Sequence, residues 1–479
     1  IAYYGALKIG AIVVMTNPLY VERELQIQLS DSGAETMIAL DLFYPRIGKI
    51  RKETRLKNII LTSVRDYLPW HLKLLYPIKA RKEGQSIRVP TVPSVYDMAQ
   101  LIKESPEAPP AVEVDSNDIA LLQYTGGTTG TPKGAILTHR NLVANTLQCR
   151  SWMPELPEGE QVFLAVVPFF HVYGMTSCMN LSIYSGSALV LLPRFATKEV
   201  LRAVEKRRVT LFMGVQPMYV AINNHPKSGR YDLSSIRVCI SGAGPLDSEV
   251  QRRFESLTGG KLIEGYGLSE ASPVTHINPI HGKRKKGSIG LPLPDTLAKM
   301  VDIETGARPL PPGEVGELVI KGPQVMRGYW GKPRESAEAL SDGWLRTGDL
   351  ATMDEEGFFF IVNRKKEMIK TRGENVYPRE VEEIISRHPQ VREAVIIGLP
   401  DPFAGEIIKA YLVLNEGAAV SAEEILSFCR KDLAKFKLPS IIEFRRELPK
   451  SILGKVMRRV LQEEESAKGK ETSPGQPGG

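Results

Sequence analysis

The sequence predicts an α/β protein, with a large N-terminal domain of parallel sheets and a small α+β domain at its C-terminal end. Strand-like apolar segments alternate with helical patterns over most of residues 1–330, which favours parallel sheets flanked by helices. Beyond residue 377, a helix, two strands and a second helix form a unit of about 100 residues, the size of a small separate domain. The chain of 479 residues is long enough to bury a core in each.

The N-terminal stretch carries the first alternation. Residues 10–18 (GAIVVMTNP) are typical of a strand and turn, residues 22–33 (ERELQIQLSDSG) of a helix, and residues 35–40 (ETMIAL) of the next strand. The helical pattern before them opens at Ile1 with no capping residue or lead-in. We therefore expect that the chain is cut upstream of this helix, within a domain.

Residues 66–82 (DYLPWHLKLLYPIKARK) break this alternation. Aromatic, aliphatic and basic side chains are mixed here, which suits a membrane interface. Pro69 and Pro77 weaken any continuous amphipathic helix in the segment. The alternative is a surface excursion that packs on its own domain, and the residues alone leave both interpretations open.

The overall composition excludes several classes of protein. Hydrophobic residues make up 42% and charged residues 24% of the chain, as in an ordinary globular protein. The net charge of +7 is too small to favour a nucleic-acid partner. Four separated cysteines form no CxxC pair, and no apolar run reaches the ~18 residues of a membrane span. We expect a cytoplasmic location. Two further possibilities stay open, peripheral attachment to the inner face of the membrane and formation of a homodimer.

The strongest functional signal is the loop at residues 125–134 (TGGTTGTPKG), which follows an apolar strand at 119–123 and precedes a helix expected near His139. Its four glycines permit backbone turns that side chains would block, so the N–H groups can form a concave anion nest. Threonine hydroxyls and Lys133 add donors and positive charge. Pro132 before the lysine, and the spacing, differ from a Walker A loop. The loop therefore predicts a site for nucleotide phosphates.

With the preceding tyrosine, this loop resembles the signature loop of the adenylate-forming (ANL) superfamily, which includes acyl-CoA synthetases, luciferases and the adenylation domains of peptide synthetases. The resemblance implies a large N-terminal domain of parallel α/β subdomains with a small β-barrel-like subdomain, followed by a small mobile α+β domain. It also implies ATP, Mg²⁺ and coenzyme A as cofactors. We expect the N-terminal domain, incomplete at its start, at 1–363, the C-terminal domain at 364–466 and a disordered tail at 467–479.

Three further segments resemble superfamily motifs that surround the acyl group and the adenine. In PFFHVYG (168–174), His171 is implied to lie where the carboxylate approaches the α-phosphate, although a lone histidine is more often structural. The turns ISGAGPL (240–246) and EGYGLSEAS (264–272) are implied to enclose the adenine. Tyr266 would stack on the ring, and the glycines would let backbone approach it.

The resemblance extends to the C-terminal end. In GWLRTGDL (343–350), Asp349 is implied to bind the ribose hydroxyls together with Arg364. The polar, glycine-containing stretch NRKKEMIKTRGENVYP (363–378) is typical of a linker, and from Arg364 onward it resembles the hinge of the superfamily. Lys366 takes the hinge position, where a few residues absorb the backbone change as the small domain rotates. LPKSILGKVMRR resembles the PKTxxGKxxR signature, with serine in place of threonine. Lys455 within it is implied to be the catalytic lysine of adenylation.

The residues implied to form the site fall into three groups. The catalytic group is Lys455, Glu270 and His171, of which Glu270 is implied to hold Mg²⁺ with Thr125 as a second ligand. The implied CoA-binding residues are Gly373, Glu374 and Asn375. The implied ATP- and AMP-binding residues are Thr125, Gly126, Gly127, Thr128, Thr129, Gly130, Lys133, Gly242, Gly244, Glu264, Gly265, Tyr266, Gly267, Ser269, Asp349, Arg364 and Lys370.

The resemblance implies a ligase that works in two steps. A carboxylate attacks the α-phosphate of ATP to give acyl-AMP, and the CoA thiol attacks the acyl-AMP after the small domain has rotated. An amino-acid substrate is disfavoured, because PFFHVYG lacks the aspartate with which peptide synthetases pair the ammonium group. The insert at 66–82 resembles that of bacterial long-chain fatty-acid–CoA ligases, so a fatty acid is the expected substrate. An aryl acid such as coumarate, and an inactive fragment that still binds nucleotide, are the alternatives.

Overall fold

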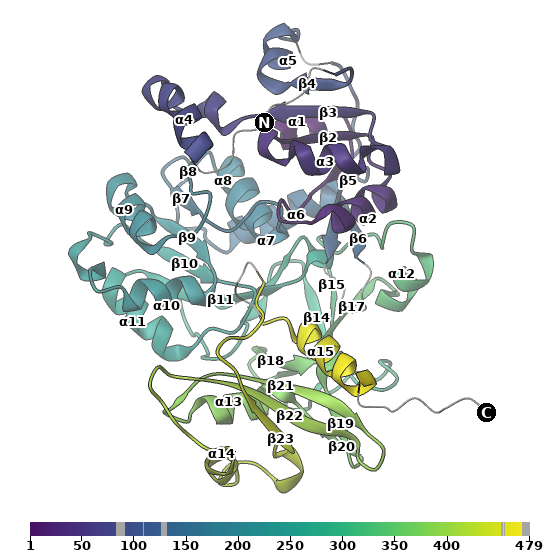
Figure 1. Cartoon of the computed structure of the whole chain (residues 1–479), viewed down its shortest axis with the longest axis vertical. Helices are drawn as coiled ribbons and strands as arrows, with labels where there is room; N and C mark the ends of the chain where they lie inside the picture. The colour runs from purple at the N-terminus through teal and green to yellow at the C-terminus, as the bar shows by residue number, and fades with distance from the viewer. Residues whose placement is uncertain (83–91, 109, 126–131, 452–453, 455, 472–479) are drawn as a thin grey trace.

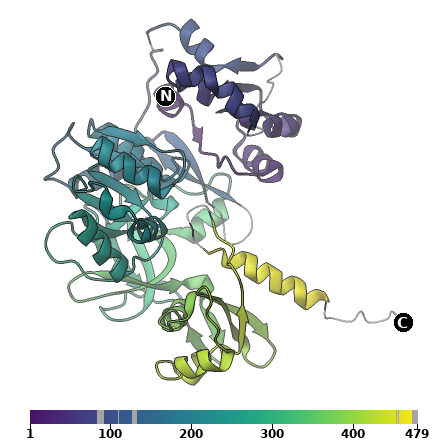
Figure 2. The same ribbon diagram turned by 60° about the vertical axis from the view of Figure 1, so that its left-hand side comes forward.

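The computed structural model describes the chain except for residues 83–91, 109, 126–131, 452–453, 455 and 472–479. The purple N-terminal elements lie at the top of Figure 1, the teal elements form the centre, and the yellow-green C-terminal elements lie at the bottom. Figure 2 shows the same order from a second side. The expected α/β architecture, with a large N-terminal and a small C-terminal part, is confirmed.

The N-terminal end of the chain forms a small parallel sheet in the order β2-β3-β4. Its elements are α1 (Ala2–Lys8), β1 (Val13–Val14), α2 (Glu22–Ser32), β2 (Thr36–Leu40), α3 (Tyr44–Ile50), β3 (Asn58–Thr62), α4 (Trp70–Lys82), β4 (Val95–Asp97) and α5 (Met98–Glu104). Leu25 and Leu29 of α2 share one helix face and are buried in the same cluster as Ile59 of the central strand. The strand, helix and strand expected within residues 10–40 are confirmed.

The predicted phosphate loop joins two strands of a hairpin. These are β5 (Ile119–Thr125) and β6 (Lys133–Thr138), which run antiparallel, while β1 pairs parallel with β5. Thr125 and Lys133 face each other at the end of this hairpin that the loop connects. The sequence predicted the strand before the loop and the helix at His139, where α6 (His139–Ser151) begins. It missed β6. The apolar residues after Lys133 become a strand only by pairing with β5, which precedes the loop in the sequence.

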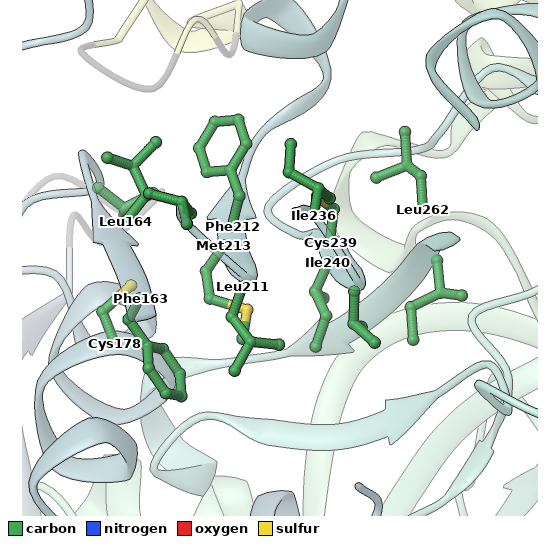
Figure 3. Packing of buried hydrophobic residues seen from close by; sticks show 14 of the residues in the cluster. Phe163, Leu164, Cys178, Leu211, Phe212, Met213, Ile236, Cys239, Ile240 and Leu262 are labelled. Carbon is green, nitrogen blue, oxygen red and sulfur yellow. The ribbon is translucent and has the colours of Figure 1, made fainter. Parts of the chain in front are cut away.

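The centre of the molecule is a seven-stranded sheet in the order β13-β12-β11-β10-β9-β7-β8, in which the five strands β7, β8, β9, β10 and β11 run parallel. The elements after α6 are β7 (Val162–Ala165), α7 (Val172–Gly174), η4 (Met175–Asn180), α8 (Leu181–Tyr184), β8 (Ala188–Leu191), α9 (Thr197–Arg207), β9 (Leu211–Gly214), α10 (Gln216–Asn224), β10 (Val238–Ser241), α11 (Ser248–Thr258), β11 (Lys261–Gly267), β12 (Val274–Ile277) and β13 (Leu291–Pro292). Strands β9 and β10 are buried throughout, which is why they are continuous apolar runs. Figure 3 shows Phe212, Met213 and Ile240 of these strands between Phe163 of β7 and Leu262 of β11.

A second, antiparallel sheet follows and corresponds to the small β subdomain that the resemblance implied. Its elements are β14 (Leu297–Val301), β15 (Gly316–Lys321), α12 (Pro333–Ala339), β16 (Leu340–Ser341), β17 (Trp344–Met353) and β18 (Phe359–Arg364). The strands pair in the order β14-β15-β17-β16, with β18 on β17. The long strand β17 therefore lies at the centre and carries the GWLRTGDL motif.

The C-terminal part has its own sheet and core, as expected. Its elements are η7 (Lys365–Glu367), β19 (Ile369–Thr371), β20 (Glu374–Val376), α13 (Pro378–Ser386), β21 (Val391–Asp401), β22 (Gly405–Leu414), α14 (Ala422–Cys429), β23 (Ile441–Phe444) and α15 (Arg458–Glu471). Two details differ from the prediction. The polar stretch after Arg364 contains a β-hairpin of β19 and β20 rather than a plain linker. Pairing of β19 with β22 attaches this hairpin to the C-terminal sheet. The tail expected to be disordered from residue 467 is helical to Glu471, and residues 472–479 lie outside the described residues.

Residues 66–82 also differ from the prediction, since most of the segment is one helix, α4, with Pro77 inside it. Pro69 lies just before the helix, and its carbonyl accepts a hydrogen bond of 2.9 Å from the Lys73 amide in the first turn. A proline inside a helix leaves one carbonyl without its partner, which is tolerable at a surface where water can replace it. In the described part of the chain, no helix has the length and apolar character to cross a membrane.

Candidate nucleotide-binding site

The two glycine-rich turns lie at one edge of the central sheet. Ser241 ends β10 and is paired with Glu264 of the parallel strand β11, so the two turns start side by side. The Gly242 amide donates to the carbonyl of Gly214, which ends the neighbouring strand β9, over 3.1 Å. The carboxyl ends of three parallel strands therefore meet here, which is where open α/β sheets bind ligands.

Two of the turn glycines have packing reasons of their own. A Cβ atom at Gly267 would lie 2.2 Å from the carbonyl oxygen of Pro273, and one at Gly242 would lie 3.1 Å from the ring of Tyr173. Nothing lies within 4 Å of a Cβ atom at Gly244. The sequence analysis gave all of these glycines one reason, close approach of the backbone to the adenine. The structure shows that Gly267 and Gly242 are tightly packed by the protein itself, whereas Gly244 is open.

Three predicted residues that are far apart in the sequence form one hydrogen-bonded group. The Tyr266 hydroxyl donates to Oδ2 of Asp349, and Nε of Arg364 lies 2.8 Å from Oδ1 of the same carboxylate. Asp349 and Arg364 face each other across β17 and β18, and Asp349 is only 3% exposed. Burial raises the pKa of Tyr266, so its hydroxyl stays protonated and remains a donor. The predicted ribose-binding carboxylate is thus held in one orientation.

Glu264 is a buried carboxyl group at the same edge. It is 7% exposed, and its Oε2 accepts a bond of 3.3 Å from the Leu246 amide. Burial raises the pKa of Glu264 to about 7, although this bond and the charge of Arg379 on α13 both act in the opposite direction. A substantial fraction of this group is therefore protonated at neutral pH.

Glu270, the predicted Mg²⁺ ligand, lies in a short 3-10 helix, η6 (Ser269–Ala271), together with Ser269. Its Oε1 accepts a bond of 2.8 Å from the hydroxyl of Tyr329. The centroid of the same tyrosine ring lies 5.4 Å from Nζ of Lys133, at the end of the phosphate loop. The sequence analysis missed Tyr329, because only the pairing of distant segments brings it here and no local motif marks it.

The groups around Glu270 suit a hard cation that arrives with a nucleotide. Among the described residues, no group donates to Oε2 of Glu270, and no set of three or more His, Cys, Asp or Glu side chains is arranged to hold a metal ion by itself. Mg²⁺ commonly takes one or two protein carboxylates and completes its shell with water and phosphate oxygens. Burial alone would lower the pKa of Arg364, but Asp349 and, more weakly, Glu270 raise it. Glu270, the predicted metal ligand, and Asp349, the predicted ribose ligand, are therefore close enough for both to act on the charge of Arg364.

His171 lies between the strand that enters the phosphate loop and the central sheet. Its ring caps α7, with Nδ1 3.5 Å from the amide of Tyr173. Gln123 of β5 donates to the carbonyl of Phe170 over 3.1 Å, and the Tyr173 hydroxyl donates to the carbonyl of Ile240 in β10 over 2.9 Å. Burial lowers the pKa of His171, so the ring is neutral at pH 7.

Part of the predicted site lies outside the described residues. This applies to Gly126, Gly127, Thr128, Thr129 and Gly130 of the loop and to Lys455. Their chain neighbours are described. Thr125 and Lys133 close the hairpin beneath the loop, and a Cβ atom at Gly454 would lie 3.1 Å from Cγ of Pro217 in the first turn of α10. Gly454 therefore lies against the start of α10, which follows β9 in the chain.

The predicted hinge and CoA residues lie in the C-terminal part. Lys366 is in η7, directly after β18, and Lys370 is in β19. Gly373, Glu374 and Asn375 lie in the β19–β20 hairpin, which Figure 1 draws well apart from β10 and β11. The structure therefore does not bring Lys370 or the three CoA residues to the nucleotide edge, and their roles stay predictions.

The fold and the site together define an enzyme with a nucleotide-binding α/β domain and a separate C-terminal domain. The AMP-binding enzyme profile matches residues 1–330, and the AMP-binding enzyme C-terminal domain profile matches residues 380–455. The chain belongs to the family of AMP-binding enzymes.

Two relatives narrow the comparison. The long-chain-fatty-acid–CoA ligase of Bacillus subtilis is 49% identical over 468 residues, which cover 97% of this chain and 83% of the relative. A feruloyl-CoA synthase of an Amycolatopsis species is 38% identical over 399 residues, which cover 83% of this chain and 78% of the relative. The expected resemblance to bacterial long-chain fatty-acid–CoA ligases is thus confirmed.

Solved structures of one protein allow a comparison of two states. ATP-bound MatB from Rhodopseudomonas palustris has a TM-score of 0.83 to this chain at 28% identity, covering 96% of this chain and 85% of that one. The apo form of MatB has a TM-score of 0.71 at the same identity and coverage. The arrangement of this chain is therefore closer to the ATP-bound form of that protein than to its apo form.

Proposed function

We propose that this chain converts a fatty acid to an acyl-AMP with ATP and then transfers the acyl group to coenzyme A. The observation that carries the proposal is the gathering of Tyr266, Asp349 and Glu270 at the carboxyl edge of the central sheet, beside the hairpin of the phosphate loop. Ribose-binding, metal-binding and phosphate-binding groups then surround one nucleotide. The identity to a long-chain-fatty-acid–CoA ligase supports the choice of substrate.

In the first step, a carboxylate oxygen of the fatty acid attacks the α-phosphorus of ATP, and the bond to pyrophosphate breaks. The loop at 125–134 holds the β- and γ-phosphates, and Asp349 orients the ribose. Lys455 neutralises charge that builds up at the reacting phosphate, which is the main contribution a protein can make to such a transfer. When bound, Mg²⁺ held by Glu270 and Thr125 would supply further charge neutralisation at the phosphates.

In the second step, the CoA sulfur attacks the acyl carbon, and AMP leaves. For this step the domain at 364–466 rotates about Lys366 relative to the domain at 1–363, so that Lys455 withdraws and Gly373, Glu374 and Asn375 approach the acyl-AMP. The separation of the β19–β20 hairpin from β10 and β11 in Figure 1 supports a mechanism in which the small domain moves between the two steps.

A membrane contact through α4 belongs to the same proposal. Trp70, Leu74 and Ile78 are 76%, 67% and 68% exposed, and the cations Lys73 and Arg81 are exposed among them. Large exposed apolar side chains beside cations suit the headgroup region of a membrane with anionic lipids. An enzyme that takes a fatty acid from a bilayer gains from such a contact.

ATP–pyrophosphate exchange with a series of acids from C2 to C18 tests the function. Exchange is expected with long-chain acids such as palmitate. An aryl acid is the second candidate, since a feruloyl-CoA synthase is among the relatives, and coumarate is included for that reason. Retained ATP binding without exchange for any acid would contradict the proposal.

The role of Lys455 is tested by separating the two steps. In Lys455→Ala, acyl-AMP formation is expected to fall by roughly 100-fold or more, because one charged stabilising group is lost. Thioester formation from supplied acyl-AMP and CoA is expected to persist. Lys450→Ala is the control, because Lys450 forms a surface ion pair with Glu393 at 2.6 Å. Equal losses in both steps would contradict the assigned role.

A further inference from the structure

The segment that carries Tyr329 is fixed by backbone bonds to two parts of the site. The Met326 amide donates to the carbonyl of Glu270 over 2.7 Å, which ties the segment to η6. The Trp330 amide donates to the carbonyl of Gly134 over 2.8 Å, which ties it to the start of β6. Its backbone therefore cannot shift without disturbing either the predicted metal ligand or the end of the phosphate loop.

The side chain of Tyr329 also contacts both of these parts of the site, at Glu270 and at Lys133. Its hydroxyl donates to Oε1 of Glu270, and its ring lies beneath Nζ of Lys133. The Tyr329 amide donates to Oγ of Ser336 over 2.8 Å, so the main chain on this side is also satisfied. A hydrogen bond to a charged acceptor is among the strongest that a neutral side chain makes. The tyrosine thus restricts a carboxylate that would otherwise rotate about its own bonds.

We infer that Tyr329 is a positioning residue that sets the orientation of Glu270 for the cation of the bound nucleotide. Oε1 is committed to the tyrosine, and Oε2 is left for Mg²⁺. The inference rests on the proposed function, because it takes Glu270 as the metal ligand. Groups that orient a metal ligand in this way typically contribute 10–100-fold to metal affinity.

Calorimetric binding of a non-hydrolysable ATP analogue to the full chain, at a series of Mg²⁺ concentrations, tests this inference. In Tyr329→Phe, which keeps the ring and removes the hydroxyl, the half-saturating Mg²⁺ concentration is expected to rise roughly tenfold or more. Analogue binding without Mg²⁺ is expected to stay close to that of the wild type. Tyr4→Phe is the matched control, because its hydroxyl donates to Oδ1 of Asn180 over 2.7 Å in a different part of the molecule.

A double-mutant cycle separates positioning from a general structural effect. If Tyr329 acts through Glu270, Tyr329→Phe adds little to the Mg²⁺ requirement of Glu270→Gln. Full additivity would overturn the inference, as would a Mg²⁺ requirement that Tyr329→Phe leaves unchanged at an unchanged melting temperature. Failure of the proposed ligase function is distinguished by the wild type, which would then show no pyrophosphate exchange while its Mg²⁺-dependent analogue binding still tests Tyr329.

Discussion

Nε of Arg364 lies 2.8 Å from Oδ1 of Asp349, and the other oxygen of this buried carboxylate accepts the hydroxyl of Tyr266. The carboxylate predicted to bind ribose therefore already has two partners that hold it in place. Asp349 is buried, whereas the Arg364 side chain is 38% exposed, so removing the carboxylate leaves a charge that water compensates only in part. This relationship links nucleotide affinity to stability at Asp349.

Asp349→Asn is expected to weaken ATP-analogue binding by roughly tenfold or more and to lower the free energy of unfolding by about 1–2 kcal/mol, because the half-buried Arg364 loses its charged hydrogen-bond partner. Calorimetry and urea unfolding measure the two effects. Asp342→Asn, in an exposed turn just before β17, serves as the control. Wild-type analogue affinity in Asp349→Asn would contradict the predicted ribose contact.

Glu264→Gln is expected to change how stability depends on pH. The folded pKa of Glu264 is raised to about 7, above the ordinary value of 4.5, so the folded state binds more protons than the unfolded state between these two pH values. Stability of the wild type therefore falls as the pH rises through this window. Glutamine removes this loss, and the variant is expected to gain roughly 2–3 kcal/mol relative to the wild type on going from pH 4.5 to pH 8.

Urea unfolding at the two pH values measures this gain. Glu314→Gln, at an exposed position, is the control. An equal difference in unfolding free energy between the wild type and Glu264→Gln at both pH values would contradict a raised pKa of Glu264 in the folded state.

Gly267→Ala and Gly244→Ala are expected to differ, although both glycines belong to predicted nucleotide turns. The new Cβ atom at Gly267 would lie 2.2 Å from a carbonyl oxygen of the backbone, so we expect a loss of about 2–3 kcal/mol in unfolding free energy. At Gly244 nothing lies within 4 Å, so stability is expected to stay within about 0.5 kcal/mol. Any effect of Gly244→Ala then falls on nucleotide binding. Equal melting temperatures of the two variants would contradict this difference.

Replacement of Trp70 and Leu74 by glutamine is expected to weaken binding to vesicles that contain about a third anionic lipid, because apolar area that would enter the interface is lost. Vesicle co-sedimentation measures the effect, and raised salt should weaken wild-type binding through screening of Lys73 and Arg81. Leu297→Gln, at an apolar side chain that is 61% exposed on β14, is the control. Unchanged sedimentation of the double variant would exclude α4 as the contact.

The sequence by itself determined the family and predicted which residues form the site. The loop TGGTTGTPKG was predicted from its own residues, and the turns around Gly244 and Tyr266 were predicted from their resemblance to superfamily motifs, because each of these signals lies in neighbouring residues. The strands β9 and β10 were predictable for the same kind of reason, since a strand buried on both faces is a continuous apolar run.

Only the tertiary structure decided how these pieces meet. The strand β6, the pairing of Tyr266 with Asp349, and the place of Tyr329 beside Glu270 all depend on contacts between segments that are distant in the chain. The hairpin after Arg364 and the helical residues 467–471 were likewise missed, because pairing with β22 and continuation of α15 outweigh a polar local sequence. Local sequence patterns indicate which side chains can bind phosphate, ribose or metal. Long-range packing decides which of these side chains come within hydrogen-bonding distance of one another.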